Sequence, residues 1–281
     1  MKGLDDILKK LKKAFPYIPI LVYFAFITLP IIFLILGSLG GGEYVTSPNL
    51  LPKISNLTFR NLERVIDRDL FWIGFLNSGI VAGVVTIFSV AIAIPTAYAF
   101  SKTKIRGGFI SLIFSFLGWL FPLTLLVISF YEMSVWMGIL DTRYAIVLSH
   151  LALVTPVSVW LLKGFFDGIK PSLINAARID GCSLPEAIWN VLLPIAKPGL
   201  AVAAFFSFIA SWGNYIFANV LIRSNEMMTM PIALQHFVTG RGALWGQISA
   251  ATLLSIIPVI IFFAVTQRWI VKGFASGMRG G

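Results

Sequence analysis

The chain has 281 residues, of which 58% are hydrophobic and only 12% charged, and its mean hydropathy is +0.89. Soluble globular domains are far less apolar, and a chain of this length cannot hide so much apolar surface from water, which excludes an ordinary soluble fold. A net charge of +10 would suggest nucleic-acid binding in a soluble protein, but the membrane topology derived below explains it, and we predict no nucleic-acid partner.

Six apolar stretches are long enough to cross a lipid bilayer as helices, which takes about 20 residues each. In chain order they are residues 17–39, 73–100, 108–131, 144–166, 198–222 and 246–269. The first is too long for the apolar core of a signal peptide and has no small-residue cleavage site before Gly40. We therefore predict an all-α integral membrane protein with one domain of six transmembrane helices at residues 17–270.

The cations set the predicted orientation, because Lys and Arg accumulate in short cytoplasmic segments. Six spans place both termini on one side, and 15 of the 22 Lys and Arg residues fall on that side. We predict a multi-pass protein of the cell membrane with a cytoplasmic segment at residues 1–16 and a cytoplasmic tail at residues 271–281.

Two predicted outer loops differ in character. Residues 40–71 carry side chains of both charges and also contain Asn56 and Asn61, as expected of a solvated cap over the helices. Residues 223–245 are rich in Met and Gly, and flexible thioethers suit an adaptable contact surface, although they also suit an ordinary connector.

Residues 167–197 on the cytoplasmic side are too polar to span the membrane, and helix signals punctuate them. Pro171 suits a first helical position, after which polar and apolar residues alternate with helical spacing. Gly181 supplies a left-handed stop, and Ser183 with Glu186 predicts a capping box for a second short helix that Pro194 ends. We predict two short helices around a glycine corner, shaped to dock another protein; a membrane-surface helix usually has more Lys and Arg.

The run Asn-Ala-Ala-Arg-Ile-Asp-Gly at residues 175–181, followed by Leu193-Pro194, resembles the EAA loop of ABC importer permeases. In that family the loop forms coupling helices that seat in a groove of the ATPase subunit. The resemblance assigns this role to Asn175, Ala176, Ala177, Asp180, Gly181, Leu193 and Pro194. The family's leading Glu is Asn175 here, which keeps hydrogen-bonding capacity but no charge.

The closing Gln-Arg-Trp-Ile-Val-Lys-Gly at residues 267–273 and Leu-Trp-Gly at residues 244–246 resemble the smaller permease subunit of maltose and trehalose importers. That resemblance implies a maltose- or trehalose-type sugar as solute, carried by alternating access. It also implies an ATPase dimer, a second homologous permease subunit and an extracytoplasmic solute-binding protein. We expect the second permease subunit to be a different chain, which would make the pair a heterodimer. The third outer loop, with Gly240, Arg241 and Gly242, would contact the binding protein.

No G-x-x-x-x-G-K-[ST] phosphate-binding loop occurs in the sequence, so we expect no enzyme activity and no cofactor in this chain, with ATP and Mg²⁺ bound by the partner ATPase. Ser211, Asn214 and Tyr215 cluster in the fifth span and are the leading candidates for the solute path, ahead of Asn77, Ser78, Thr86 and His150. Such groups equally bond neighbouring helices.

Rival functions remain open at this point. Another oligosaccharide, a glycerol phosphate or a polyamine is an alternative solute, although uncharged candidates disfavour a polyamine. An ion-coupled secondary transporter is a further alternative, but such carriers usually keep charged relays at membrane depth, whereas Glu132, Lys163 and Asp167 fall at span ends.

Overall fold

The computed structural model describes residues 17–40, 57–103, 105, 107–115, 122–239 and 242–277. They belong to two compact units, Met1–Arg68 with Phe237–Leu254 and Asp69–His236 with Ser255–Gly281. The predicted segment 1–16 and the end of the tail lie outside the described residues.

Four helices in the described part of the chain are long and apolar enough to cross a membrane. They are α2 (Tyr17–Leu39), α4 (Asp69–Lys102), α8 (Arg143–Asp167) and α15 (Trp245–Gly277). Each covers one of the predicted spans, and α15 continues past residue 271 into the predicted tail. The multi-pass membrane character predicted from composition is therefore confirmed.

The third and fifth predicted spans look different. The third contains α5 (Gly108–Ser115) and α7 (Leu123–Trp136), separated by residues 116–121, which lie outside the described part. The fifth is broken, because α12 (Lys197–Trp212) ends before Gly213 and α13 (Ile216–Leu221) begins three residues later. The count of six complete crossings stays a prediction.

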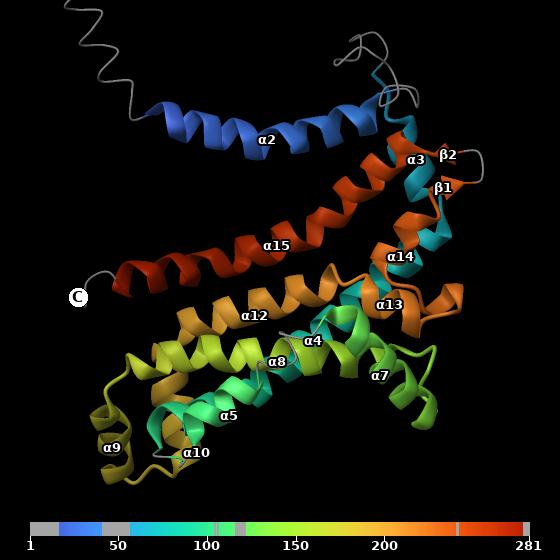
Figure 1. Cartoon of the computed structure of the whole chain (residues 1–281). Helices are drawn as coiled ribbons and strands as arrows, with labels where there is room; N and C mark the ends of the chain where they lie inside the picture. The colour runs from blue at the N-terminus through green and yellow to red at the C-terminus, as the bar shows by residue number, and fades with distance from the viewer. Residues whose placement is uncertain are drawn as a thin grey trace, which may run out of the picture. The chain divides into compact units, whose positions relative to one another are not determined.

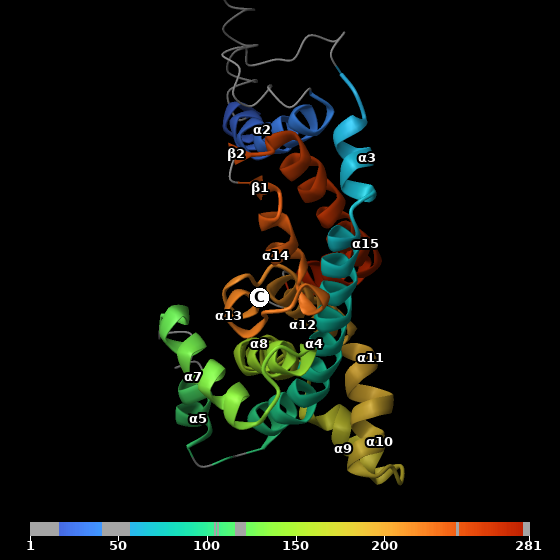
Figure 2. The same cartoon turned by 90° about the vertical axis from the view of Figure 1, so that its right-hand side faces the viewer.

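The second unit is built on α4, α8 and α12, which pack against one another (Figures 1 and 2). Small residues allow the close approach. At Gly199 of α12, a Cβ atom would lie 2.5 Å from Cγ of Phe165 on α8. Fully buried Ser158 of α8 is 2.9 Å, oxygen to oxygen, from both Ser89 of α4 and Ser207 of α12, so one hydroxyl cluster joins all three helices.

Aromatic rings join the Ser255–Gly277 part of α15 to α12. The ring of Phe262 stacks on that of Phe208 with centroids 4.6 Å apart. The Phe262 ring also stacks on that of Phe205, with centroids 6.2 Å apart. Phe208 also stacks on Trp212 at the end of α12. Aromatic stacking adds to the stabilisation that comes from burying these large side chains, and together they hold α12 against this part of α15.

The first unit contains α2, α3 (Arg60–Ile66), the start of α15 and a hairpin of two two-residue strands, β1 (Val238–Thr239) and β2 (Gly242–Ala243). Here the interpretation of residues 40–71 as a solvated cap is wrong for Asn61. Its amide is buried and donates to the carbonyls of Ser38 (3.1 Å) and Gly40 (2.8 Å). A Cβ at Gly246 would lie 2.4 Å from Asn61 Nδ2, so a larger residue there would displace the Asn61 amide.

Candidate functional site

The 167–197 segment forms two short helical arms around a glycine corner. The first arm, α9 (Pro171–Ile179), begins at proline as predicted, because proline lacks the N–H that the first helical turn leaves unpaired. Gly181 has φ +97°, a conformation that glycine adopts without penalty. Apart from the two adjoining residues, no residue that the structure describes has a heavy atom within 4 Å of the position of a Cβ at Gly181, so the corner faces open space.

The second arm begins with the predicted capping box. The Ser183 N–H and Oγ–H each donate to Glu186 Oε2 over 2.7 Å, at the start of α10 (Leu184–Ala187). These hydrogen bonds from the Ser183 side chain and backbone lower the pKa of the Glu186 carboxyl. The carboxylate thus fixes the turn between the two arms.

The prediction that Pro194 ends the second helix is wrong. A π-helical turn, η3 (Ile188–Leu192), follows α10, and Pro194 then lies inside α11 (Leu193–Ile195). A π turn bonds to the fifth residue instead of the fourth, so it can accommodate a residue without an N–H. The arm ends at Ala196, where the chain bends by 83° into α12.

Apolar packing attaches both arms to the helix bundle. Ile174 and Ala177 of α9 and Leu192 of the second arm are buried in one cluster with Ala97 of α4 and Phe166 of α8. Lys102 Nζ also donates to the carbonyl of Ile169 over 2.5 Å. The arms are therefore held firmly at the end of α4 and α8, where Figure 1 shows α9 and α10 projecting.

Burial divides the residues that the resemblance assigned to docking. Ala177 and Leu193 are 9% exposed and face the internal cluster, so they position the arms and do not present a surface. The others are exposed: Asn175, Ala176, Asp180, Gly181 and Pro194.

Two apolar side chains that the sequence analysis did not select stand out on the arms. Ile179 is 86% exposed and Trp189 is 71% exposed. Ile179 lies outside the apolar stripe of α9, and this break in the helical pattern was the signal that could have identified it. Exposed apolar side chains at the end of a firmly anchored element suit a protein contact.

A second group of polar residues gathers where α12 breaks. Nδ1 of the buried His150, on α8, is 2.8 Å from Oγ of the buried Ser211, near the end of α12. Asn214 Oδ1 accepts from the N–H of Phe217 over 3.2 Å, and the Gln235 amide donates to the Tyr215 hydroxyl. The structure thus brings Ser211, Asn214 and Tyr215 together at one break, with Tyr215 36% exposed.

The remaining solute-path candidates have structural partners. Thr86 bonds to the Ala82 carbonyl of its own helix over 2.7 Å. Asn77, 2% exposed, donates through Nδ2 to the carbonyls of Glu226 and Met228, each 2.8 Å away, and its Oδ1 accepts from Arg143 Nε over 2.8 Å. Ser78 Oγ accepts the N–H of Met230 over 2.8 Å.

These bonds hold the 223–236 segment, which contains η4 (Asn225–Met227) and α14 (Met230–Gln235). The interpretation of its methionines as a contact surface is wrong for Met228 and Met230, which are 1% exposed and belong to the core. Gly240 and Arg241 lie outside the described residues, and Gly242 is in β2.

Asp141 forms a second anchor for the 223–236 segment. This residue has φ 59°, and its Oδ1 accepts from the N–H of Arg223 (2.9 Å), the N–H of Ser224 (3.0 Å) and the Ser224 hydroxyl (3.0 Å). Partial burial opposes ionisation, but the hydrogen bonds from Ser224 and Arg223 outweigh it and lower the pKa of the Asp141 carboxyl. The segment is therefore bonded to two different elements.

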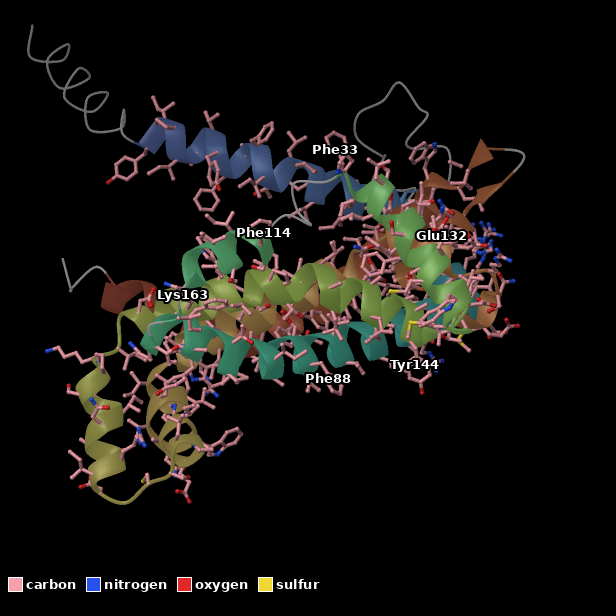
Figure 3. The ribbon with its side chains drawn as sticks, turned by 60° about the horizontal axis from the view of Figure 1, so that its bottom comes forward. Phe33, Phe88, Phe114, Glu132, Tyr144 and Lys163 are labelled. Atoms are coloured by element: carbon pink, nitrogen blue, oxygen red, sulfur yellow. The ribbon has the colours of Figure 1, made fainter. Side chains whose placement is uncertain are left out.

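Charged groups occupy the ends of the long helices. Figure 3 shows Lys163 near the end of α8 that leads to the 167–197 segment, and Glu132 of α7 near the opposite end. Lys163 pairs with Asp167 over 2.7 Å. The apolar helices and the pair of arms anchored at one end of them define a polytopic membrane protein.

Comparison with known proteins identifies the family. Residues 89–276 match the model of the binding-protein-dependent transport system inner membrane component, and the chain belongs to this family of ABC importer permeases, in its carbohydrate-uptake branch. The chain is 30% identical to the maltose/maltodextrin transport system permease protein of Salmonella typhimurium, over 97% of each chain.

Other relatives support the same assignment. The chain is 30% identical to the trehalose transport system permease protein of Mycobacterium tuberculosis, over 89% of this chain and 91% of the relative. A solved bacterial ABC transporter involved in the import of the acidic polysaccharide alginate has a chain that matches with a TM-score of 0.76 at 25% identity, over 92% of this chain and 96% of that one.

Proposed function

We propose that this chain is one of two permease subunits of an ATP-driven importer that moves a sugar of the maltose or trehalose type into the cell by alternating access. The relatives named above transport maltose, maltodextrin and trehalose, and the similarity extends over nearly the whole chain. The uncharged polar groups at the α12 break favour a neutral solute over a polyamine. Alginate, the acidic polysaccharide of the solved relative, is the second candidate.

The 167–197 segment is the proposed seat of the partner ATPase. The observation that carries this proposal is that internal packing fixes both arms while Asn175, Ala176, Ile179 and Trp189 remain exposed. A firmly held element transmits force, and its exposed apolar residues can bury themselves in a groove of another protein. Residues on the 223–245 loop, including Gly240, Arg241 and Gly242, are proposed to contact the solute-binding protein on the other side of the membrane.

A pair of glycine substitutions tests this docking. Gly181→Val adds a β-branched side chain at φ +97° in open space, which costs about 1 kcal/mol of backbone strain and adds volume at the proposed contact. We expect the variant to reach the membrane normally but to lose the ATPase on purification of the complex, together with sugar-stimulated ATP hydrolysis. The measurement is ATPase activity of the reconstituted importer with binding protein and sugar.

Gly138→Val is the matched control. Gly138 has φ +67° and, like Gly181, has open space at its Cβ position among the described residues, but it follows α7 at the far end of the unit. It should retain the ATPase. Normal sugar-stimulated hydrolysis in Gly181→Val would remove the docking assignment. Failure of the wild-type importer to take up maltose, trehalose or an alginate oligosaccharide would remove the proposed solute class.

A further inference from the structure

A buried nitrogen atom without a partner lies beside the break in α12. His150 is 1% exposed, and its Nδ1 is bonded to Ser211, but among the described residues its Nε2 has no hydrogen-bond partner. The Phe217 ring stands edge-on to the imidazole, with ring centroids 6.3 Å apart. A buried polar atom left unpaired is costly, so its retention calls for a ligand or a role.

The surroundings show where a ligand would come from. Residues 213–215 interrupt the helix, and Gly213 and Tyr215 are exposed, so the break reaches the surface of the unit. Asn214 is half-buried, and its side chain lies close to the imidazole. Irregular backbone at membrane depth is tolerated where it lines a cavity or is buried in protein.

The chemistry of the position fits a hydroxyl. Depending on the tautomer, neutral His150 offers at Nε2 either a donor or an acceptor, and a hydroxyl can pair with both. Tyr215 supplies an exposed aromatic ring at the same break, and aromatic rings with a few placed polar groups are typical of small-molecule sites. A charged solute finds no opposite charge among the residues described here at the break, His150, Ser211, Asn214 and Tyr215.

We propose that His150 contacts the solute: a hydroxyl of the carried sugar bonds to Nε2 as the sugar passes the α12 break, and this contact helps to decide which sugars are carried. The proposal rests on the proposed function and adds a specificity-determining residue to it. Ser211 holds the ring through Nδ1 and so positions Nε2. The Phe217 ring packs against one side of the His150 imidazole, so the contact with the sugar is limited to the other side.

The test uses the complete importer with His150→Leu, which keeps an apolar volume and removes both ring nitrogens. Initial uptake rates are measured at saturation for the two fastest sugars among maltose, trehalose, diacetylchitobiose and an alginate oligosaccharide. If only one is carried, its deoxy derivatives serve as the second solute. Loss of one hydrogen bond predicts a maximal rate lower by about tenfold for the sugar that uses the contact, and a changed ratio between the two sugars.

Two variants make the test decisive. His150→Gln keeps a polar group near Nε2 and should restore part of the rate. Ser149→Ala is the matched control and should leave the ratio unchanged. The Ser149 hydroxyl is also buried, but within the described part of the chain it bonds only to the Ala145 and Ile146 carbonyls of its own helix. An unchanged ratio between sugars in both His150 variants overturns the contact. Absence of wild-type uptake for every sugar would instead refute the proposed function.

Discussion

The second unit holds a short segment at each of its two ends, and it does so by different means. At one end, buried apolar side chains such as Ile174 and Leu192 attach the 167–197 segment to the helices. At the other end, side-chain hydrogen bonds attach the 223–236 segment: Asn77 donates to backbone carbonyls, whereas Ser78 and Asp141 accept from backbone N–H groups. Stability lost by truncating a packed side chain grows with the volume removed, whereas a hydrogen bond to a buried group is either made or lost. The comparison therefore predicts different responses to substitution.

The largest effect is expected at Asn77. Asn77→Leu leaves the Glu226 and Met228 carbonyls and the Arg143 Nε without their bonds, which should cost about 4 kcal/mol in the free energy of unfolding. Thermal unfolding of the detergent-solubilised protein measures the loss. Asn77→Asp keeps an acceptor for Arg143 but no donor, so it should lie between Asn77→Leu and the wild type. Wild-type stability of Asn77→Leu would show that these bonds do not hold the segment.

A smaller effect is expected from packing at the other end. Leu192 is fully buried, and Leu192→Ala should destabilise the protein by about 3 kcal/mol through lost contacts and a cavity. Ile195, three residues away and 47% exposed, provides the control: Ile195→Ala should cost under about 1 kcal/mol. The same thermal assay applies to both. Equal losses at the two positions would contradict the internal packing of the second arm.

The smallest effect concerns pH and the capping box. The folded-state pKa of Glu186 is lowered by Ser183, so the stabilisation is complete above the ordinary pKa of 4.5 and disappears as pH falls through the lowered value. The neighbouring Cys182, the only cysteine, reports on this turn. Its thiol should react faster with a dipyridyl disulfide in Glu186→Ala than in the wild type at pH 7.

The difference in thiol reaction rate between Glu186→Ala and the wild type should shrink in acid, since protonation then weakens the wild-type cap as well. Ser172→Ala, at an exposed position of α9, serves as a control and should match the wild type at every pH. A difference that grows in acid would mean that the carboxylate does not stabilise this turn.

Local signals in the sequence predicted local structure well. Proline at the start of α9, glycine at φ +97° and the Ser183–Glu186 pair lie within a few residues of one another and were all found where expected. The end of the second arm was missed, because the effect of Pro194 depends on the π turn before it, and tertiary packing of Leu192 and Leu193 stabilises that turn.

Contacts between distant residues could not be predicted in the same way. His150 and Ser211 are 61 positions apart, and Asn77 bonds to carbonyls about 150 positions away. These residues are recognisable in the sequence as polar groups inside spans, but hydrophobic periodicity does not say which polar group bonds to which. It also treated Met228 and Met230 as surface, since burial of a loop depends on anchors such as Asn77.

The π turn at residues 188–192 has an evolutionary consequence. A π turn accommodates one residue more than an α turn while the helix on either side keeps its direction. If a lineage gained or lost a single codon here, a change between a π turn and an α turn would keep the inward-facing Leu193 against its neighbours. Where relatives differ in length between Ser183 and Lys197, we expect the inserted or deleted residue to lie in this turn.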